Sequence, residues 1–202
     1  DRYRQQAGWT SGLRHSLFDR LGWSRLRSVL EVGCGTGAVL STLERGPQAF
    51  GIDLDPAPLS IARRSAPQAH LARADGLRLP FPYGAFDLTF CHFLLLWVPD
   101  PLQALREMAR VTRPGGFVLA LAEPDYSARI DHPPDLHILG ALQADALRRQ
   151  GADPESGRKL SGLFHAAGLQ DVETGVLGGQ WASPPSRSAF ESEWSTLRSD
   201  LA

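Results

Sequence analysis

The sequence predicts one α/β domain built on a doubly wound, mostly parallel sheet. Short apolar runs alternate with helical stretches along most of the chain, and several of these runs end at a glycine or an acidic residue. Apolar runs separated by helices are typical of βαβ units, whose parallel strands are covered on both faces. With 202 residues and an apolar fraction of 43%, the chain can bury the core that such a domain needs.

The elements expected in the N-terminal half follow this alternation. A first helix, capped by Thr10 or Ser11, precedes a strand over 28–32 and a glycine-rich turn over 33–37. We expect a short helix directly after this turn, because apolar residues recur there at helical spacing. Further strands are predicted at 49–53, 70–74, 86–91 and 117–122, with helices that start at Pro56 and span 102–111 between them.

The C-terminal half is less regular. Helices are predicted over 136–149, 157–167 and 187–201, and a sixth strand over 169–177. No seventh strand is recognisable after the sixth, so an edge of the sheet would be exposed if none exists.

Composition and charge limit the possible partners. The net charge is −1, which gives no support for binding to nucleic acid or to an acidic membrane surface. No apolar run reaches the roughly 20 residues of a membrane span, and no signal peptide is visible. The cysteines, Cys34 and Cys91, are too few for a disulfide framework, so we expect a cytoplasmic protein. Neither histidines nor cysteines show the spacing of a metal site.

The glycine-rich turn is the first candidate ligand site. Ligands of open α/β sheets bind beyond the carboxyl ends of the strands, and glycines let the backbone approach them closely. The N–H groups of the following helix would suit an anionic group. The turn also fits the pattern G-x-G-x-x-A of dinucleotide-binding proteins, and a tight turn without a ligand is the third interpretation.

Two acidic residues narrow these interpretations. Asp53 closes the second predicted strand, where a carboxylate can accept both hydroxyls of a ribose, whether from NAD or from an S-adenosyl group. Glu31 lies inside an otherwise apolar strand just before the glycines. A buried carboxylate is costly without partners, so Glu31 predicts either a cationic ligand or an ion pair or hydrogen bond within the fold.

The ordered set of motifs resembles the class I S-adenosylmethionine-dependent methyltransferases, whose fold is Rossmann-like. The resemblance is closest to the small-molecule branch, which includes the ubiquinone and menaquinone biosynthesis type. It implies an enzyme that uses S-adenosyl-L-methionine to methylate a small molecule. It also implies an N-terminal helical cap (1–27), a cofactor-binding core (28–123), a substrate-side cap (124–168) and a C-terminal strand and helix (169–202). The segments that carry the resemblance are 29–37, 51–56, 74–88 and 110–116.

The resemblance also implies roles for individual residues around the cofactor. Glu31 would act through the ammonium group, Asp53 would hold the ribose and Leu54 would pack against adenine. Asp75 would accept the adenine amino group. The residues expected to line the rest of the cofactor are Gly33, Cys34, Gly35, Thr36 and Gly37 in the turn, Gly76 or Leu77 through a backbone N–H, and Cys91, His92 and Phe93 beneath it. Tyr3, Trp9 and Arg14 would close over it, or else serve only helix packing.

The acceptor side is less defined. His92 follows the fourth strand and is the first candidate for a general base, with a hydrogen-bonded structural histidine as the alternative. Methyl transfer needs a base only if the acceptor is protonated at neutral pH. The other candidates for the substrate pocket are Phe93, Trp97, Glu123, Asp125, Tyr126, His132 and His137, with Trp181 and Trp194 as residues that could instead pack in the core.

Three other functions remain open at this point. An NAD-dependent oxidoreductase would explain the glycine pattern, but it leaves Glu31 and Asp75 without a role. A non-catalytic S-adenosylmethionine-binding or assembly domain would share every cofactor residue. An RNA or protein methyltransferase is disfavoured, because residues 91–94 read Cys-His-Phe-Leu where an N-P-P-Y-like segment would be expected.

Overall fold

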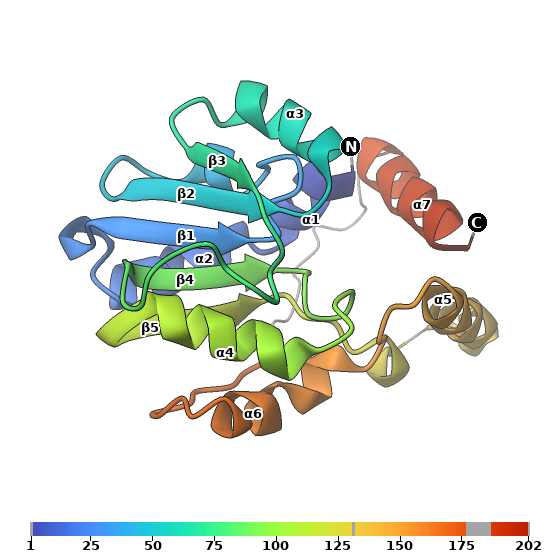
Figure 1. Cartoon of the computed structure of the whole chain (residues 1–202). Helices are drawn as coiled ribbons and strands as arrows, with labels where there is room; N and C mark the ends of the chain where they lie inside the picture. Colours follow the sequence, from blue (N-terminus) through green and yellow to red (C-terminus); the bar gives the residue numbers. More distant parts are fainter. Residues whose placement is uncertain (1, 131, 177–186, 202) are drawn as a thin grey trace.

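A computed structural model of the chain describes residues 2–130, 132–176 and 187–201. Its centre is a parallel sheet of five strands in the order β3-β2-β1-β4-β5 (Figure 1). The order reverses between β1 and β4, where ligands of doubly wound sheets bind beyond the strand ends. The predicted fold class is therefore confirmed. The strands are β1 (Ser28–Val32), β2 (Gln48–Asp53), β3 (His70–Arg73), β4 (Phe86–His92) and β5 (Thr112–Leu121).

Helices cover both faces of this sheet, as its apolar strands require. One core cluster joins Phe18 of α2 and Leu59 of α3 to one face of the sheet. The other joins Leu105 and Met108 of α4, with Leu163 of α6, to the opposite face. These covering helices are α2 (Ser11–Arg20), α3 (Pro56–Ser65), α4 (Pro101–Val111) and α6 (Ser156–Ala166).

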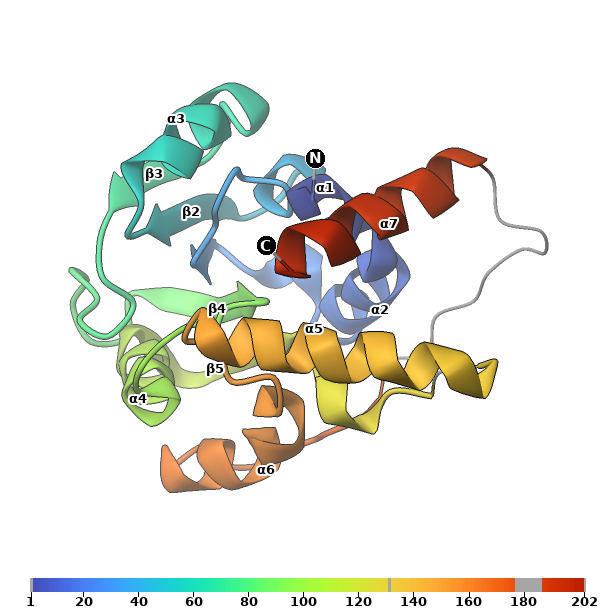
Figure 2. The same cartoon turned by 90° about the vertical axis from the view of Figure 1, so that its right-hand side faces the viewer.

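Three further helices lie beyond the carboxyl ends of the strands. Figure 1 shows α5 and α7 to the right of the arrowheads, and Figure 2 shows α7 crossing in front of the sheet beside α1 and α5. The helix α6 instead packs next to α4, so only α5 of the expected substrate-side cap overhangs the strand ends. The bounds are α1 (Arg2–Trp9), α5 (His137–Arg149) and α7 (Arg187–Leu201), with 3-10 turns at Trp23–Arg25, Leu40–Thr42, Tyr126–Ala128 and Pro134–Leu136.

The helix predicted after the glycine-rich turn does not form. Only the 3-10 turn Leu40–Thr42 follows it. The hydroxyls of Ser41 and Thr42 donate to the carbonyl oxygens of Ala38 and Val39, which offers the backbone an alternative to helical pairing. The apolar spacing was therefore right about burial, since Val39 and Leu40 are buried, but wrong about the element.

The sixth strand is also wrong over residues 169–176, which adopt no regular structure, and Leu177 lies outside the described residues. Asp171 has φ 51, a left-handed conformation that interrupts an extended chain. Val176 is fully exposed, so the segment lacks the alternating burial that would dock it on β5. Among the described residues, no helix is long and apolar enough to cross a membrane.

Candidate functional site

The glycine-rich turn at the end of β1 is tied to the end of β2. The N–H groups of Gly33 and Cys34 donate to the carbonyl oxygen of Ile52 at 2.8 and 2.9 Å. Both oxygens of the Asp53 carboxylate accept backbone N–H groups. Oδ2 accepts that of Gly35 at 2.7 Å, and Oδ1 accepts that of Asp55 at 2.9 Å. Asp53 thus lies directly beside the turn, as its position at a strand end predicted.

Side chains within the turn point into the fold. Cys34 is 4% exposed, and its Sγ lies 3.0 Å from where a Cβ on Gly51 would stand. Thr36 is 6% exposed, and its Oγ1 has no hydrogen-bond partner among the described residues. Burial raises the pKa of the Cys34 thiol, with Glu31 and Asp53 acting in the same direction. Cys34 can therefore face a ligand only through its backbone.

Glu31 is the buried acid of the site. It is 2% exposed, and its Oε2 finds no hydrogen-bond partner in the described part of the chain. Burial raises its pKa well above the usual value, Arg14 lowers it and Asp53 raises it further. An unpartnered buried carboxylate oxygen is rare in native proteins and calls for a ligand or a counter-ion.

The N-terminal helices α1 and α2 cover the carboxyl ends of β1 and β2. The ring of Tyr3 lies 2.9 Å from where a Cβ on Gly35 would stand, so Tyr3 rests on the turn. Burial and then the charge of Asp53 raise the pKa of Tyr3. Trp9 meets Phe93 edge-on, with ring centroids 6.5 Å apart. Tyr3 and Trp9 therefore both contact residues that were predicted to surround the cofactor.

Arg14 and His92 meet at Thr10, below this cover. Nη1 of Arg14 donates to Oγ1 of Thr10 at 2.5 Å and to the carbonyl oxygen of Ala7 at 2.6 Å. The same Thr10 oxygen lies 2.8 Å from Nε2 of His92. Thr10 begins α2 but makes no side-chain cap bond, because its hydroxyl is used here. Arg14 is 2% exposed, and burial lowers its pKa while Glu31 raises it.

His92 is held as a neutral imidazole. Burial, followed by the charge of Arg14, lowers its pKa to about 4. The hydroxyl of Thr10 can donate either to the carbonyl oxygen of Ala7 at 3.4 Å or to Nε2 of His92. In either arrangement Nε2 is engaged by Thr10, which is unfavourable for a general base that acts through this nitrogen. That role of His92 stays a prediction.

Asp75, at the end of β3, folds back on its own turn. Its Oδ1 accepts the N–H of Leu77 at 2.9 Å. The Leu77 N–H is thus already used, which leaves Gly76 as the backbone donor expected near adenine. Leu54, the expected partner of the adenine ring, is 60% exposed beside this region.

The carboxylate of Glu123, predicted for the acceptor pocket, is engaged by backbone N–H groups instead of pointing at open space. Its Oε1 accepts the N–H groups of Leu94 and Leu95 at 2.8 and 3.0 Å, and its Oε2 accepts that of Leu96 at 3.2 Å. The Sγ of Cys91 also lies 3.9 Å from Oε1. Cys91 is fully buried, so like Cys34 it can face a ligand only through its backbone.

Among the acceptor candidates, the structure brings Phe93 and Tyr126 together. Both pack on a small buried cluster of Leu96, Leu147 and Ala152. Burial, followed by Asp200, raises the pKa of Tyr126. The other candidates lie elsewhere: Asp125 pairs with Arg158 at 2.6 Å, Trp194 stacks with Phe190, Trp97 is 40% exposed, His132 and His137 are exposed, and Trp181 lies outside the described residues.

A polar network above the strand ends was not predicted. Asp200 of α7 is fully buried, pairs with Arg2 of α1 at 2.5 Å and accepts from Nε2 of Gln143 of α5 at 2.6 Å. Arg129 donates to the same Gln143. These residues stand far apart in the sequence, and no motif links them, so only the packing of α1, α5 and α7 reveals the network.

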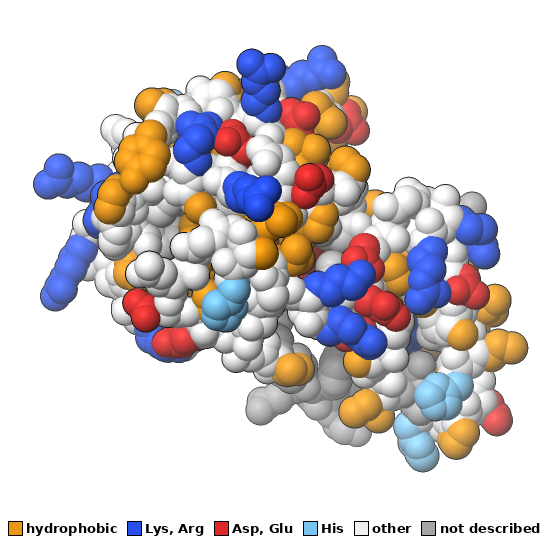
Figure 3. All heavy atoms as spheres, turned by 60° about the horizontal axis from the view of Figure 1, so that its bottom comes forward, with side chains coloured by type: hydrophobic (Ala, Val, Ile, Leu, Met, Phe, Trp, Pro, Cys, Tyr) orange, Lys and Arg blue, Asp and Glu red, His pale blue; other side chains and the backbone are white. Residues whose placement is uncertain are grey.

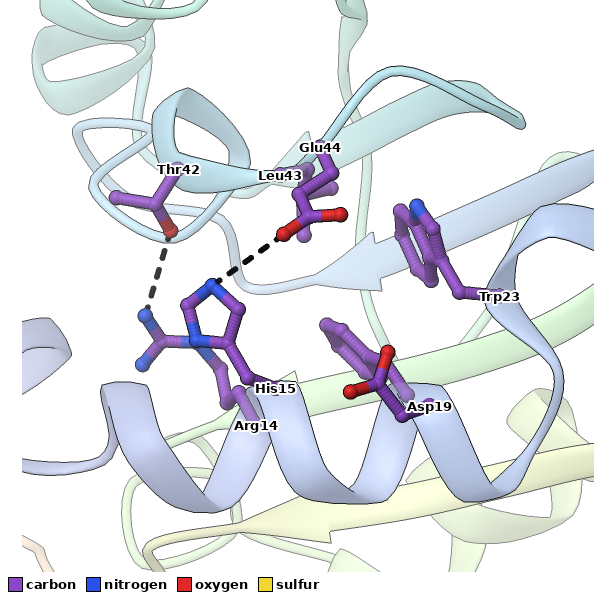
Figure 4. Close-up of a pocket in the computed structure, with 8 residues that line it drawn as sticks. Arg14, His15, Asp19, Trp23, Thr42, Leu43 and Glu44 are labelled. Carbon is purple, nitrogen blue, oxygen red and sulfur yellow. Dashed lines mark hydrogen bonds and ion pairs between the residues drawn. The ribbon is translucent and has the colours of Figure 1, made fainter.

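Two cavities border the cover. The smaller, of about 20 Å³, lies between α2 and residues 42–44 (Figure 4). It has the volume of one or two waters and cannot hold a cofactor. The larger, of about 400 Å³, lies within the size range of small-molecule sites. Its lining includes Arg4, Ser11, Arg14, Ser41 and Ser65. No group of three or more potential metal ligands occurs in the described residues.

Comparison with known sequences agrees with this geometry. Residues 30–120 match the family described as Methyltransferase domain. The chain is 32% identical over 170 residues to a demethylmenaquinone methyltransferase of Bacillus licheniformis, which covers 72% of each chain. It is 33% identical over 168 residues to a malonyl-[acyl-carrier protein] O-methyltransferase of Halorhodospira halophila, 72% of this chain but only 57% of that relative.

A solved structure adds a cofactor to the comparison. The chain is 30% identical to CalS10, an amino pentose methyltransferase of Micromonospora echinaspora whose structure holds S-adenosylmethionine. The TM-score is 0.50, and the match covers 61% of this chain and 54% of CalS10. The likeness therefore covers a part of each protein and not the whole of either.

Proposed function

This chain belongs to the class I S-adenosylmethionine-dependent methyltransferases, and from that premise we propose that it transfers a methyl group to a small-molecule acceptor. The observation that carries the proposal is that Gly35, Asp53 and Glu31, whose Oε2 has no partner among the described residues, lie together at the carboxyl ends of β1 and β2. Family membership also separates S-adenosylmethionine from NAD, a choice that the glycine turn left open. No observation favours the non-catalytic alternative.

The residues present fit the cofactor. The unpartnered Oε2 of Glu31 would receive the ammonium group, directly or through a small polar network. Each oxygen of Asp53 accepts one backbone N–H and keeps acceptor capacity for a ribose hydroxyl. Tyr3 lies where a group stacked on Gly35 would stand, so its ring must move aside and can then cover the cofactor.

The chemistry asks little of the side chains. The sulfonium supplies an activated methyl group, so this chain has to align the acceptor with it and exclude water. Holding the two reactants in line can lower the activation barrier by up to roughly 7–11 kcal/mol. The cover built by α1 and α2 would exclude water. His92 would anchor that cover through Thr10, which agrees with its engaged Nε2 and its lowered pKa.

For the acceptor we propose a compact, largely apolar molecule. Phe93 and Tyr126 lie together on an apolar cluster beside the strand ends, and rings of this kind suit a flat acceptor. Relatives of the chain are named for the methylation of demethylmenaquinone and for ubiquinone biosynthesis, and the quinone ring named there is a flat group. Nucleic acid is a poorer candidate, because basic and acidic side chains are interspersed on the face shown in Figure 3. The buried free thiols of Cys34 and Cys91 agree with a cytoplasmic location.

The test has a binding part and a transfer part. Calorimetric titration should detect binding of S-adenosylmethionine and no binding of NADH. Incubation with methyl-labelled S-adenosylmethionine and a metabolite extract should then move the label to an apolar small molecule, which mass spectrometry identifies. Binding without label transfer to any fraction would favour the non-catalytic domain, and NADH binding alone would refute the proposal.

A further inference from the structure

We propose that Glu123 is a positioning residue for methyl transfer, whose carboxylate holds residues 94–96 against the cofactor-binding glycine turn. The inference rests on the proposed function, because the turn matters only if a cofactor binds there. Glu123 itself touches neither the turn nor the acceptor candidates. It acts through the segment that follows β4, which places it outside the roles predicted from the sequence.

The carboxylate is the centre of this segment. Three consecutive N–H groups, from Leu94, Leu95 and Leu96, converge on its two oxygens at 2.8, 3.0 and 3.2 Å. Residues 94–96 have no strand or helix to satisfy these donors. A buried N–H without an acceptor is costly, so the carboxylate determines the path of the segment.

The segment connects the two halves of the site. A Cβ on Gly33 would stand 2.6 Å from Cδ1 of Leu94, so the Leu94 side chain fills the space over that glycine. Leu96 packs with Leu147 of α5, and its carbonyl oxygen accepts the N–H of Asp153 at 2.7 Å. A shift of residues 94–96 would therefore move the wall at Gly33 and the apolar cluster beneath Phe93 together.

The backbone is strained both in the segment that Glu123 binds and next to Glu123 itself. Phe93 has φ 54 and Ala122 has φ 59, and neither is a glycine. Left-handed conformations of such residues persist only where surrounding contacts impose them, and they gather at functional sites. Phe93 directly precedes the segment bonded to Glu123, and Ala122 directly precedes the acid, so the hydrogen bonds to Glu123 act beside both strained residues, together with the bond from the Phe93 N–H to the carbonyl oxygen of Leu121.

The surroundings of Glu123 make its charge sensitive to pH near neutrality. Burial raises its pKa to about 7, against the lowering by the N–H groups of Leu95, Leu94 and Leu96. On β4, Glu123 faces the thiol of Cys91. Burial, followed by the charge of Glu123, raises the pKa of this thiol, so Cys91 stays neutral. On α6, Gly157 lies against the backbone of Glu123 and Ser156 donates to the carbonyl oxygen of the next residue, Pro124, and neither side chain carries a charge. A protonated carboxyl cannot accept all three N–H groups equally well.

The decisive experiment compares S-adenosylmethionine binding by wild type, Glu123→Gln and Asp87→Asn at pH values from about 6 to 8. The amide keeps the size of Glu123 but turns a donor toward the N–H groups. We expect Glu123→Gln to bind about tenfold more weakly near pH 8 and the gap to narrow near pH 6. Equal affinity of both proteins at every pH would overturn the inference.

Asp87→Asn is the matched control. Asp87 is a buried acid that also accepts backbone N–H groups, in this case two, but it lies at the opposite end of β4. This variant should keep both the affinity and the pH profile of the wild type. The α-amino group of the ligand, with a pKa near 7.7–8.0, titrates identically against all three proteins and cancels in the comparison.

A second variant keeps the inference testable should Glu123→Gln fail to fold. Leu94→Ala should weaken binding as well, and the double variant should lose less than the sum of both losses. In the wild type, hydrogen exchange of the Leu94–Leu96 amides, corrected for its intrinsic pH dependence, should lose protection near pH 6. Unchanged protection, or full additivity, contradicts the inference. A wild type that binds no S-adenosylmethionine refutes the proposed function itself.

Discussion

Each end of the central sheet carries an acid that accepts N–H groups of a neighbouring segment, yet the buried Asp87 and the half-buried Glu123 differ in charge compensation. At the amino end of β4, Asp87 accepts the N–H groups of Arg27 and Ser28 at 2.6 and 3.0 Å and pairs with Arg113 at 2.5 Å. Its pKa is lowered, because these partners outweigh burial. At the carboxyl end, Glu123 has no cation in contact among the described residues, and burial raises its pKa to about 7.

The difference extends to the surroundings of the two acids. The carboxyl end also holds the unpartnered oxygens of Glu31 and Thr36 and the left-handed backbone of Phe93 and Ala122. Unsatisfied groups and strain cost free energy and are retained where a ligand or a mechanism uses them. The amino end has one such group among the described residues, Nε1 of Trp23 in the turn before β1. The carboxyl end concentrates more of them, which is the pattern expected of a ligand site.

The largest effect that tests this contrast is expected for Asp87→Ala. Two N–H groups lose a charged acceptor, at about 1.5–3 kcal/mol each, so the free energy of unfolding should fall by roughly 3–6 kcal/mol. Affinity for S-adenosylmethionine should stay unchanged in the molecules that remain folded. Urea denaturation and calorimetry measure the two quantities. A loss of affinity that exceeds the unfolded fraction would mean that the two ends are not independent.

The pH dependence of stability is the next effect. The folded pKa of Glu123, about 7, exceeds its ordinary value of 4.5. Its contribution to stability is therefore fully present below pH of about 4.5 and is lost as the pH rises through about 7. Relative to Glu123→Gln, the wild type should lose roughly 2–3 kcal/mol between those limits. A stability difference between the two proteins that stays constant across this range would show that folding does not raise the pKa of Glu123.

Asp53→Ala should show the opposite of the result expected for Asp87→Ala, which lowers stability and leaves affinity unchanged. Its effect should fall on affinity, with S-adenosylmethionine bound at least tenfold more weakly, or about 1.4 kcal/mol. Asp53→Asn keeps one acceptor oxygen and should lose less. Calorimetric titration of both variants decides the matter, and wild-type affinity in Asp53→Ala would refute the ribose assignment.

The smallest expected effect concerns His92. Because its pKa is lowered to about 4, it should stay neutral through the neutral pH range. The turnover of wild type and His92→Gln should then share one pH profile, whatever their relative rates. An NMR titration of the imidazole checks the cause directly, since a midpoint above about 6 would restore His92 as a candidate base.

The elements that the sequence predicted correctly depend on residues that are close together in the chain. The strand over 28–32, the helix that begins at Pro56 and the acid Asp53 beside the turn all follow from residues close together in the sequence. The helix expected after Gly37 failed because the Ser41 and Thr42 hydroxyls compete for its backbone, and the strand expected over 169–177 failed where Asp171 turns left-handed. Both errors arose where apolar spacing was the main evidence.

By itself the sequence determined which strand ends carry glycines and acids, because a strand's periodicity and its terminal residue are local properties. Only the tertiary structure decided what each acid does there. Asp53 bonds the turn, Glu31 keeps an oxygen without a partner, and Glu123 holds residues 94–96. The reason is physical: the burial, the charge and the hydrogen-bond partners of a carboxylate depend on neighbours that only folding supplies.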